Sequence, residues 1–399
     1  MRLASLLCAL TLAVSACQAE RNDPRDEDPD TDSDTERDTD PDTEDLTPAE
    51  ACAAALSADP VTVDEKQLAA LAFDGRGLWY AWGHNEPRQL VGTLHRMDCR
   101  GQTLMSAIPL QPEGNINAVN DLVIDDGVVA VSWLPRPEPE WPLAMRYAFY
   151  DAETGAELGA GSVEFPDANQ VYGSQILATD AGWFMAVTAE DEAEALTLHV
   201  LSFGPDHAPE IVPGGSYPRQ GWLNRPGQLT WDGEALHLLF SEDRDDDWVA
   251  EVYYATVGDE PVQVGSLDTF GKAGLFQGSD GTLYAHYGVG QLLVQPLGGT
   301  STLLLPSNME QVEVVPVGDT LVLSNNNDWD GGTFCMLAEL TADPDSPAIG
   351  NLLDTRPGCP TRLGALGDAH VVYAADVDNG WGYEIRAVGL DELRTEEGR

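Results

Sequence analysis

Three short segments of this chain carry oxygen-bearing side chains at a spacing that suits a bound cation. They contain Asp243, Asp245 and Asp247; Asn326, Asp328 and Asp330 ahead of Gly331; and the shorter pair Asp376 and Asp378. Calcium takes several oxygen ligands from a tightly turning backbone, so calcium is the candidate cofactor at these segments. Leu337 stands where a complete calcium loop has its bidentate glutamate. Solvated turns without metal are therefore the alternative interpretation.

A fourth segment, residues 214–225, combines two arginines with two aromatic side chains. It contains Tyr217, Arg219, Trp222 and Arg225, in a chain with 20 Lys and Arg against 68 Asp and Glu. Arginine donates bidentate hydrogen bonds to carboxylates, and aromatic rings stack on sugars or peptide groups. We expect a connection between two repeats that anchors an acidic or glycan ligand. The alternative is that both arginines pair with nearby aspartates of the protein.

Tryptophans and histidines also collect in the polar segments between apolar runs. The candidates for ligand contact there are Trp82, His84, Trp248, Trp329 and Trp381. Tryptophans on loops are good binding anchors, although packing over the strand ends is an equal alternative. His286 falls in a similar segment. The sequence contains no Gly-x-Ser-x-Gly, His-Glu-x-x-His or phosphate-binding loop, so we assign no catalytic residue.

A repeat of about fifty residues positions all of these segments. Each unit has an apolar strand, a tight Asp-Gly or similar turn, a second apolar strand, a polar loop and a third strand, often followed by a weaker fourth. The turns fall at Asp74-Gly75, Asp126-Gly127, Asp180-Ala181, Asp232-Gly233, Asp280-Gly281, Gly318-Asp319 and Gly367-Asp368. Asp-Gly between strands is a strong hairpin signal. Seven such units predict an all-β fold, a β-propeller of seven four-stranded blades, with a sandwich or solenoid as alternative.

The start of the repeat region suggests how the ring closes. Val61–Val63 has strand character and no partner in its own unit, so we expect it to supply the outer strand of the last blade and remove an exposed edge. Thr47-Pro48-Ala49-Glu50 is a capping box with proline at the first helical position, which predicts a short helix over 48–57.

Four cysteines remain downstream of residue 17: Cys52, Cys99, Cys335 and Cys359. An even number in an exported chain indicates two disulfides, for which three pairings exist. Nearness in the chain favours Cys52 with Cys99 and Cys335 with Cys359. None of the four belongs to a Cys-x-x-Cys pair, which gives zinc binding little support.

The N-terminus has the order of an export signal. Arg2 precedes a short apolar run, Leu3 to Val14, and Ser15-Ala16-Cys17 follows. This resembles the signal peptide and lipobox of bacterial lipoproteins. The resemblance implies cleavage after residue 16, lipid on Cys17 and, through Gln18, an outer-membrane location. An ordinary secretory signal is the alternative. Residues 17–46 are rich in Asp and Glu and predict a disordered acidic tether, ahead of the propeller domain at 47–399.

Composition limits the partners. The formal net charge of −48 argues against nucleic acid and against direct docking on anionic lipid. We therefore expect a monomer that contacts the membrane only through its lipid anchor. We hypothesise a binding or scaffold module for a protein or glycan partner. The alternative is an extracellular polymer-degrading enzyme, a hydrolase or lyase, with its site in the funnel of the propeller.

Overall fold

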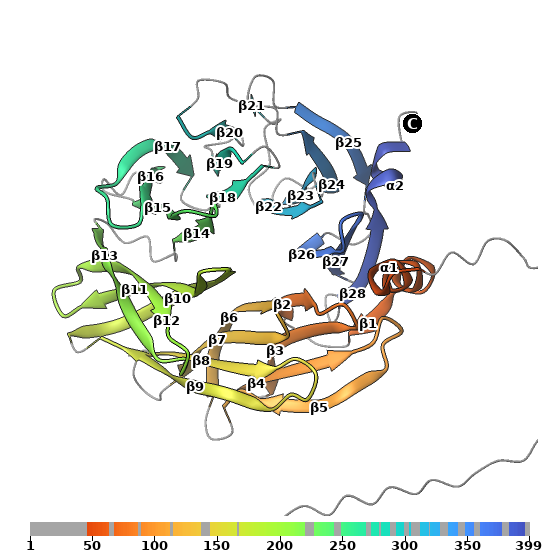
Figure 1. Cartoon of the computed structure of the whole chain (residues 1–399), viewed down its shortest axis with the longest axis horizontal. Coiled ribbons are helices and arrows are strands. Elements are labelled where there is room, and N and C mark those ends of the chain that lie inside the picture. Colours follow the sequence, from red (N-terminus) through yellow and green to blue (C-terminus); the bar gives the residue numbers. More distant parts are fainter. Residues whose placement is uncertain are drawn as a thin grey trace, which may run out of the picture. The chain divides into compact units, whose positions relative to one another are not determined.

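The computed structural model describes residues 46–63, 68–86, 89–111, 115–136, 144–165, 167–219, 227–242, 249–268, 273–278, 281–287, 293–298, 303–304, 312–318, 320–327, 334–341, 348–354, 360–376 and 383–395. The segment from Asp45 to Arg399 forms one compact unit. Within it, the described strands form seven four-stranded antiparallel sheets, arranged around an open centre like blades (Figure 1). This is the predicted all-β propeller.

Each blade has an inner, a second, a third and an outer strand. The inner strands are β2 (Leu68–Phe73), β6 (Asn115–Asp125), β10 (Ala168–Thr179), β14 (Gln228–Trp231), β18 (Gly274–Gln277), β22 (Val312–Val317) and β26 (Pro360–Leu366). The second strands are β3 (Leu78–Glu86), β7 (Val128–Arg136), β11 (Gly182–Asp191), β15 (Leu236–Glu242), β19 (Leu283–Tyr287), β23 (Thr320–Asn327) and β27 (His370–Asp376).

The third strands are β4 (Gln89–Met97), β8 (Ala144–Asp151), β12 (Leu196–Phe203), β16 (Val249–Thr256), β20 (Leu293–Pro296), β24 (Phe334–Thr341) and β28 (Tyr383–Gly389). The outer strands are β5 (Thr103–Pro109), β9 (Glu157–Glu164), β13 (Pro209–Arg219), β17 (Val262–Asp268), β21 (Leu303–Leu304), β25 (Ala348–Asp354) and β1 (Val61–Val63). Two helices, α1 (Pro48–Ala58) and α2 (Leu390–Thr395), complete the described elements.

The predicted turns join the first two strands of the blades. At one of them Asp126 and Gly127 both have positive φ, 42° and 75°, as a two-residue hairpin turn requires. Asp232 shows how the aspartate secures such a turn: its Oδ1 accepts the backbone N–H groups of Glu234 and Ala235, and its Oδ2 lies 2.8 Å from His237 Nε2. Backbone donation from Ala235 and Glu234, followed by the His237 contact, lowers the pKa of Asp232 to about 2.

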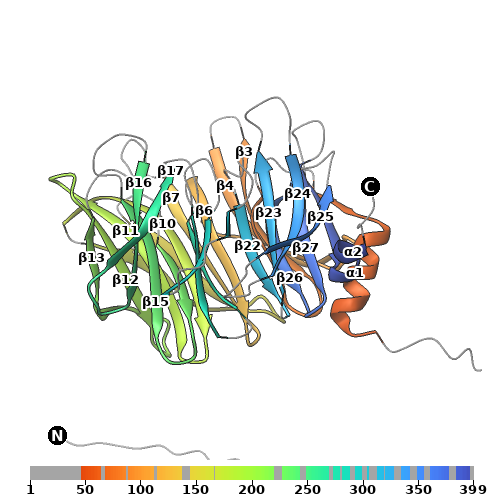
Figure 2. The ribbon, with the colours of Figure 1, turned by 90° about the horizontal axis from the view of Figure 1, so that it is seen from above.

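The ring closes as expected. β1 pairs antiparallel with β28, so residues from the two ends of the domain share one blade. The predicted helix α1 begins with the capping box, in which the Thr47 backbone N–H donates to Glu50 Oε2 at 2.7 Å. Helix α1 packs against β28, and its Ser57 hydroxyl donates to the Ala387 carbonyl at 2.8 Å. Figures 1 and 2 show both helices on the outside of this blade.

A disulfide fastens this closure to the first blade. Cys52 in α1 bonds to Cys99 in the turn between β4 and β5, which confirms the first predicted pairing. For the second predicted pair, the structure places Cys335 in β24 without describing its side chain, and Cys359 lies outside the described residues. That pairing stays a prediction.

The apolar core lies between neighbouring blades. One cluster joins Trp79 and Leu94 of the first blade to Ile116 and Val129 of the second, all with no exposed surface. The blades approach closely there, because a Cβ on Gly92 would lie 2.5 Å from Ile116 Cδ1. Second strands are buried on both faces, and every residue of β15 is buried. Strands in such a position tolerate continuous apolar runs, which explains why apolar and polar residues do not alternate strictly along β15.

Candidate functional site

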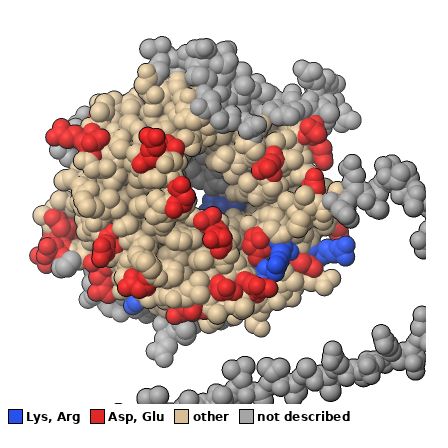
Figure 3. All heavy atoms as spheres, in the orientation of Figure 1, with Lys and Arg blue, Asp and Glu red and all other residues tan. Residues whose placement is uncertain are grey.

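The centre of the ring is a channel with a volume of about 630 Å³. Its lining comes from all seven inner strands, with additions from β15 and β19. Figure 3 shows the hollow in the middle of one face, whose surroundings carry many acidic side chains. The volume is within the range of about 300–1,000 Å³ typical of small-molecule sites. The channel is therefore the candidate functional site.

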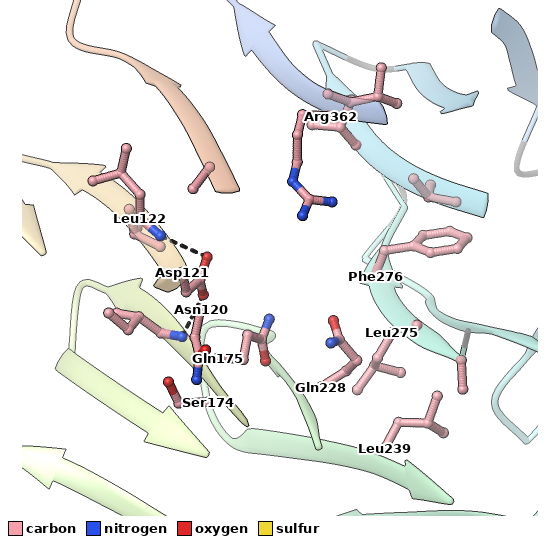
Figure 4. Close-up of a pocket in the computed structure, with 18 of the residues that line it drawn as sticks. Asn120, Asp121, Leu122, Ser174, Gln175, Gln228, Leu239, Leu275, Phe276 and Arg362 are labelled. Carbon is pink, nitrogen blue, oxygen red and sulfur yellow. Dashed lines mark hydrogen bonds between the residues drawn. The ribbon is translucent and has the colours of Figure 1, made fainter. Parts of the chain in front are cut away.

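Three polar residues of the channel occupy the same position in their blades. Asp121, Gln175 and Arg362 each stand four residues before the last residue of their inner strand, in β6, β10 and β26. Inner strands run side by side around the axis, so equivalent positions lie at one level of the channel. Figure 4 shows these three side chains around the same space.

Asp121 ties its blade to the next one. Its Oδ2 accepts the backbone N–H of Ile176 in β10 at 2.7 Å, and its Oδ1 accepts the N–H of Leu122 at 2.9 Å. Both carboxylate oxygens therefore accept backbone N–H groups in the channel wall. Such bonds hold two blades in register at the inner rim, where strands of different blades have no ladder of their own.

Gln175 repeats this bond one blade further on. Its Oε1 accepts the backbone N–H of Leu229 in β14, which is the counterpart of the bond from Ile176 to Asp121. In the following blade the Thr230 hydroxyl donates to the Leu275 carbonyl of β18 at 3.1 Å. Side-chain to backbone bonds thus link four consecutive inner strands. Two of the bonds fix the channel side chains of Asp121 and Gln175 in place before any ligand enters.

Arg362 and His286 supply the basic side chains of the lining. Arg362 is half-buried, and its guanidinium projects from β26 into the channel (Figure 4). His286 is 5% exposed and lies against Phe276, with ring centroids 6.2 Å apart. It belongs to strand β19, which corrects the expectation that it lies in a loop. Gly274 makes room for it, because a Cβ there would lie 1.9 Å from His286 Nε2.

The structure moves the first half of the 214–225 segment out of the expected connection. Tyr217 and Arg219 belong to outer strand β13 and are 5% and 4% exposed. Tyr217 accepts the Gly258 N–H at 2.9 Å, and Arg219 donates to Thr188 Oγ1 at 3.3 Å and to the Ser241 carbonyl. Both side chains are thus buried in blade packing. Arg219 pairs within the protein, but the bonds described for it go to a hydroxyl and a backbone carbonyl and not to the aspartates that the alternative expected.

Most of the other candidates lie outside the described residues. These are the ligand-contact candidates Trp222, Arg225, Trp248, Trp329 and Trp381, and the proposed calcium ligands Asp243, Asp245, Asp247, Asp328, Asp330 and Asp378. Four more belong to strands without a described side chain: Trp82 and His84 in β3, Asn326 in β23 and Asp376 in β27. Their assignment to loops is thereby corrected, and their roles stay predictions.

Two observations bear on metal and membrane, both limited to the described residues. There, no group of three or more His, Cys, Asp or Glu side chains is placed to hold a metal ion. Neither described helix has the length and apolar character that crossing a membrane requires.

Comparison with known proteins adds only distant similarities. The sequence matches no protein-family profile, and no curated protein sequence is similar to it. Among solved structures, Sqt1 from Chaetomium thermophilum superposes with a TM-score of 0.47 at 14% identity, covering 79% of this chain and 82% of its own. The β-propeller domain of Cps50 (Swd1) from Myceliophteria thermophila gives 0.45 at 12% identity, covering 82% and 97%. The Hadza microbial sialidase Hz136 gives 0.46 at 10% identity, covering 82% and 66%.

Similarities at this level carry no functional conclusion. The strand pairing of this chain itself defines its class, a β-propeller with a central channel. The channel residues Asp121, Gln175 and Arg362 were not singled out by the sequence patterns. A signal existed: each is a long polar or charged side chain at the same offset from a hairpin turn.

Proposed function

We propose that this chain is an exported β-propeller, tethered by lipid on Cys17 in the cell envelope, which binds a glycan or protein partner. The observation that carries the binding function is the channel. It is large enough for part of a ligand, and bonds within the wall hold the side chains of Asp121 and Gln175 in place. Groups fixed before binding lose little conformational entropy when the ligand arrives, which favours affinity.

The anchor rests on sequence. Arg2, the apolar run and Ser15-Ala16-Cys17 support export and lipidation, and Gln18 favours the outer membrane. Residues 17–46 then separate Cys17 from the propeller. A flexible chain of that length spans roughly 30 Å on average, and mutual repulsion of its carboxylates extends it further. The propeller would stand clear of the membrane, with its faces open to partners.

One observation favours the enzyme as the second candidate. The channel brings a carboxylate, an imidazole and a guanidinium into one lining, from Asp121, His286 and Arg362. These are group types that hydrolases and lyases use. Against this, both carboxylate oxygens of Asp121 already accept backbone N–H groups of the wall, which leaves this side chain in a structural role.

A binding assay with a product readout separates the two candidates. The full chain in detergent micelles is applied to glycan and peptide arrays, and each retained ligand is then incubated with the protein in solution. A binding module retains ligand saturably and returns it intact. New reducing ends, unsaturated sugars or peptide termini that accumulate with time would replace the binding proposal by the enzyme. Radiolabelled fatty acid incorporated in cells by the wild type, and not by Cys17→Ala, tests the anchor.

A further inference from the structure

We propose that the central channel binds a sugar acid, a ligand with one carboxylate and several hydroxyl groups, and that Arg362 holds the carboxylate. This deepens the binding function proposed above and rests on it. The carboxylate comes from a free monosaccharide acid or from a single acidic residue on a neutral glycan. Both sources share the chemistry that the channel would recognise.

The charged groups of the channel lining give the first argument. Of the Asp, Glu, Lys and Arg residues among the described residues, only Asp121 and Arg362 line the channel. The two oxygens of Asp121 accept N–H groups of Leu122 and Ile176, so its acceptor sites are engaged within the wall. Arg362 instead directs its guanidinium into the open space (Figure 4). The guanidinium is thus a local cation that faces the channel, in a chain of net charge −48.

The geometry of Arg362 suits a carboxylate. A guanidinium is planar and donates two parallel N–H bonds to the two oxygens of one carboxylate. Its five N–H donors allow it to keep an interaction with the protein and hold a ligand at the same time. It is half-buried, so that water screens the pair less than on the surface.

Gln175 adds a donor on the opposite side of the channel. The Leu229 N–H can bond only to the amide oxygen, and this contact fixes which end of the amide is which. The NH₂ group of Gln175 is therefore the end that remains toward the channel, as Figure 4 shows. Gln228 contributes a second amide to the lining. Amides both donate and accept, which matches the hydroxyl groups of a sugar.

The surrounding charge narrows the ligand class further. Acidic side chains surround the channel mouth on the face seen in Figure 3, and the chain as a whole is strongly negative. Such a field repels ligands that carry several negative charges. A ligand with one carboxylate among neutral hydroxyls meets less repulsion than a phosphate ester or a polyuronate, while still matching the single arginine.

The test is calorimetric titration of the full chain in detergent micelles. The probes are galacturonate, glucuronate and mannuronate, each beside its neutral sugar, and xylotriose with and without a single glucuronate branch. At least one acid is expected to bind, and its neutral partner about 10- to 100-fold more weakly, the effect of losing hydrogen bonds to a charged group. The monosaccharides and the branched chain distinguish a free acid from an acidic residue on a glycan.

Four variants make the test specific. Arg362→Gln should weaken acid binding by about 10- to 100-fold, and Arg362→Lys by less. Gln175→Glu keeps the oxygen that accepts the Leu229 N–H and places a negative charge in the channel, so it should weaken acid binding as well. Arg76→Gln is the matched control, since Arg76 is 70% exposed in a surface pair with Glu153. It should leave the affinity unchanged.

Melting curves show which variants are folded, and Gln175→Glu keeps the test decisive if Arg362→Gln does not fold. Acid binding that survives in folded Arg362→Gln or Gln175→Glu would overturn the proposal. Retention of neutral glycans or peptides, with no sugar acid bound, would overturn it as well while leaving the binding function intact. If no probe binds, either on the arrays or in the calorimeter, both the sugar-acid proposal and the proposed binding function are contradicted.

Discussion

Asp74 Oδ2 lies 2.7 Å from Nη2 of Arg96, and the two side chains are 4% and 9% exposed. The same oxygen accepts the Trp79 Nε1–H at 2.8 Å, while Oδ1 accepts the backbone N–H groups of Arg76 and Gly77. Arg96 also donates to the Glu153 carbonyl at 3.3 Å, in a turn of the second blade. One hairpin aspartate thereby connects its own turn, the third strand of its blade and the next blade.

Removal of the Asp74 side chain should lower the free energy of unfolding far more than removal of an exposed aspartate at an equivalent turn. Asp74→Ala leaves Arg96 buried without its carboxylate, and we expect a loss of about 3–5 kcal/mol in the free energy of unfolding. The control is Asp180→Ala at the equivalent turn of the third blade, where the side chain is exposed, with a change within about 0.5 kcal/mol. Urea unfolding of both variants measures the difference. Equal effects would show that the Asp74 contacts do not stabilise the fold.

The Cys52–Cys99 disulfide should stabilise the ring closure. It joins residues 47 apart in sequence, which restricts the unfolded chain by about 2–4 kcal/mol. Cys52→Ala/Cys99→Ala should lower the free energy of unfolding by that amount and speed hydrogen exchange of Val61–Val63, whose strand leads on from α1. Reductant should change the wild type in the same direction and the double variant much less. Unchanged exchange in β1 would mean that its pairing with β28 does not depend on the disulfide.

Arg219 should act on stability and leave ligand binding alone. Burial lowers its pKa to about 10, although nearby Glu242 opposes that shift. Arg219→Met would leave Glu242, 3% exposed, without this cation, which costs about 3–5 kcal/mol. Adding Glu242→Gln should restore part of the loss. A folded Arg219→Met with wild-type stability and weaker ligand binding would reinstate the surface anchor expected from the sequence.

Stability should fall between pH 6.5 and pH 4 because of two histidines. Burial lowers the pKa of His95 and of His199 from 6.5 to about 4. In this range the unfolded chain binds protons that the folded chain does not, so their contribution is complete above pH 6.5 and is lost toward pH 4. His95→Gln/His199→Gln should flatten the dependence of the urea midpoint on pH in this window. An equally steep dependence in the double variant would contradict the assignment.

The acidic side of this profile should have a separate cause. Asp232 has its pKa lowered to about 2 from 3.8, so its contribution is present above pH 3.8 and is lost as the pH falls toward 2. Asp232→Asn should therefore reduce the loss of stability below pH 3.8 and leave the slope between pH 6.5 and 4 unchanged. A change of the slope between pH 6.5 and 4 would show that the titration of Asp232 is coupled to that of His95 and His199.

The fold could be predicted well from the sequence because short local motifs mark the turns and the helix start of the repeat region. Turns such as Asp126-Gly127 require particular backbone angles, and the capping box at Thr47 and Glu50 marks the start of α1. Even the closing strand β1 could be inferred, because an unpaired edge needs a partner. Helix α2 gave no comparable signal, because it has only six residues. Leu390 and Leu393 are buried by tertiary packing, which the local sequence does not indicate.

The candidate site was harder to predict because it depends on neighbours distant in sequence. Arg219 is an arginine close to aromatic residues in the sequence, as a ligand anchor would be. In the fold it is buried and donates to the Ser241 carbonyl and to Thr188. In the sequence, Asp121 does not differ from other polar residues of strands. Its carboxylate accepts the N–H of Ile176, which lies 55 positions later, and only the fold shows this contact. Function at the axis of a ring is set by which strands meet there. A single repeat does not contain that information.

Hydrogen–deuterium exchange of the full chain, with and without a ligand retained on the arrays, tests the central claim most directly. If the channel is the binding site, ligand should slow exchange in the lining strands β6, β10, β14 and β26. The outer strands β9, β13 and β17 should exchange as before. Protection confined to the outer strands, with the inner strands unchanged at saturating ligand, would contradict the account.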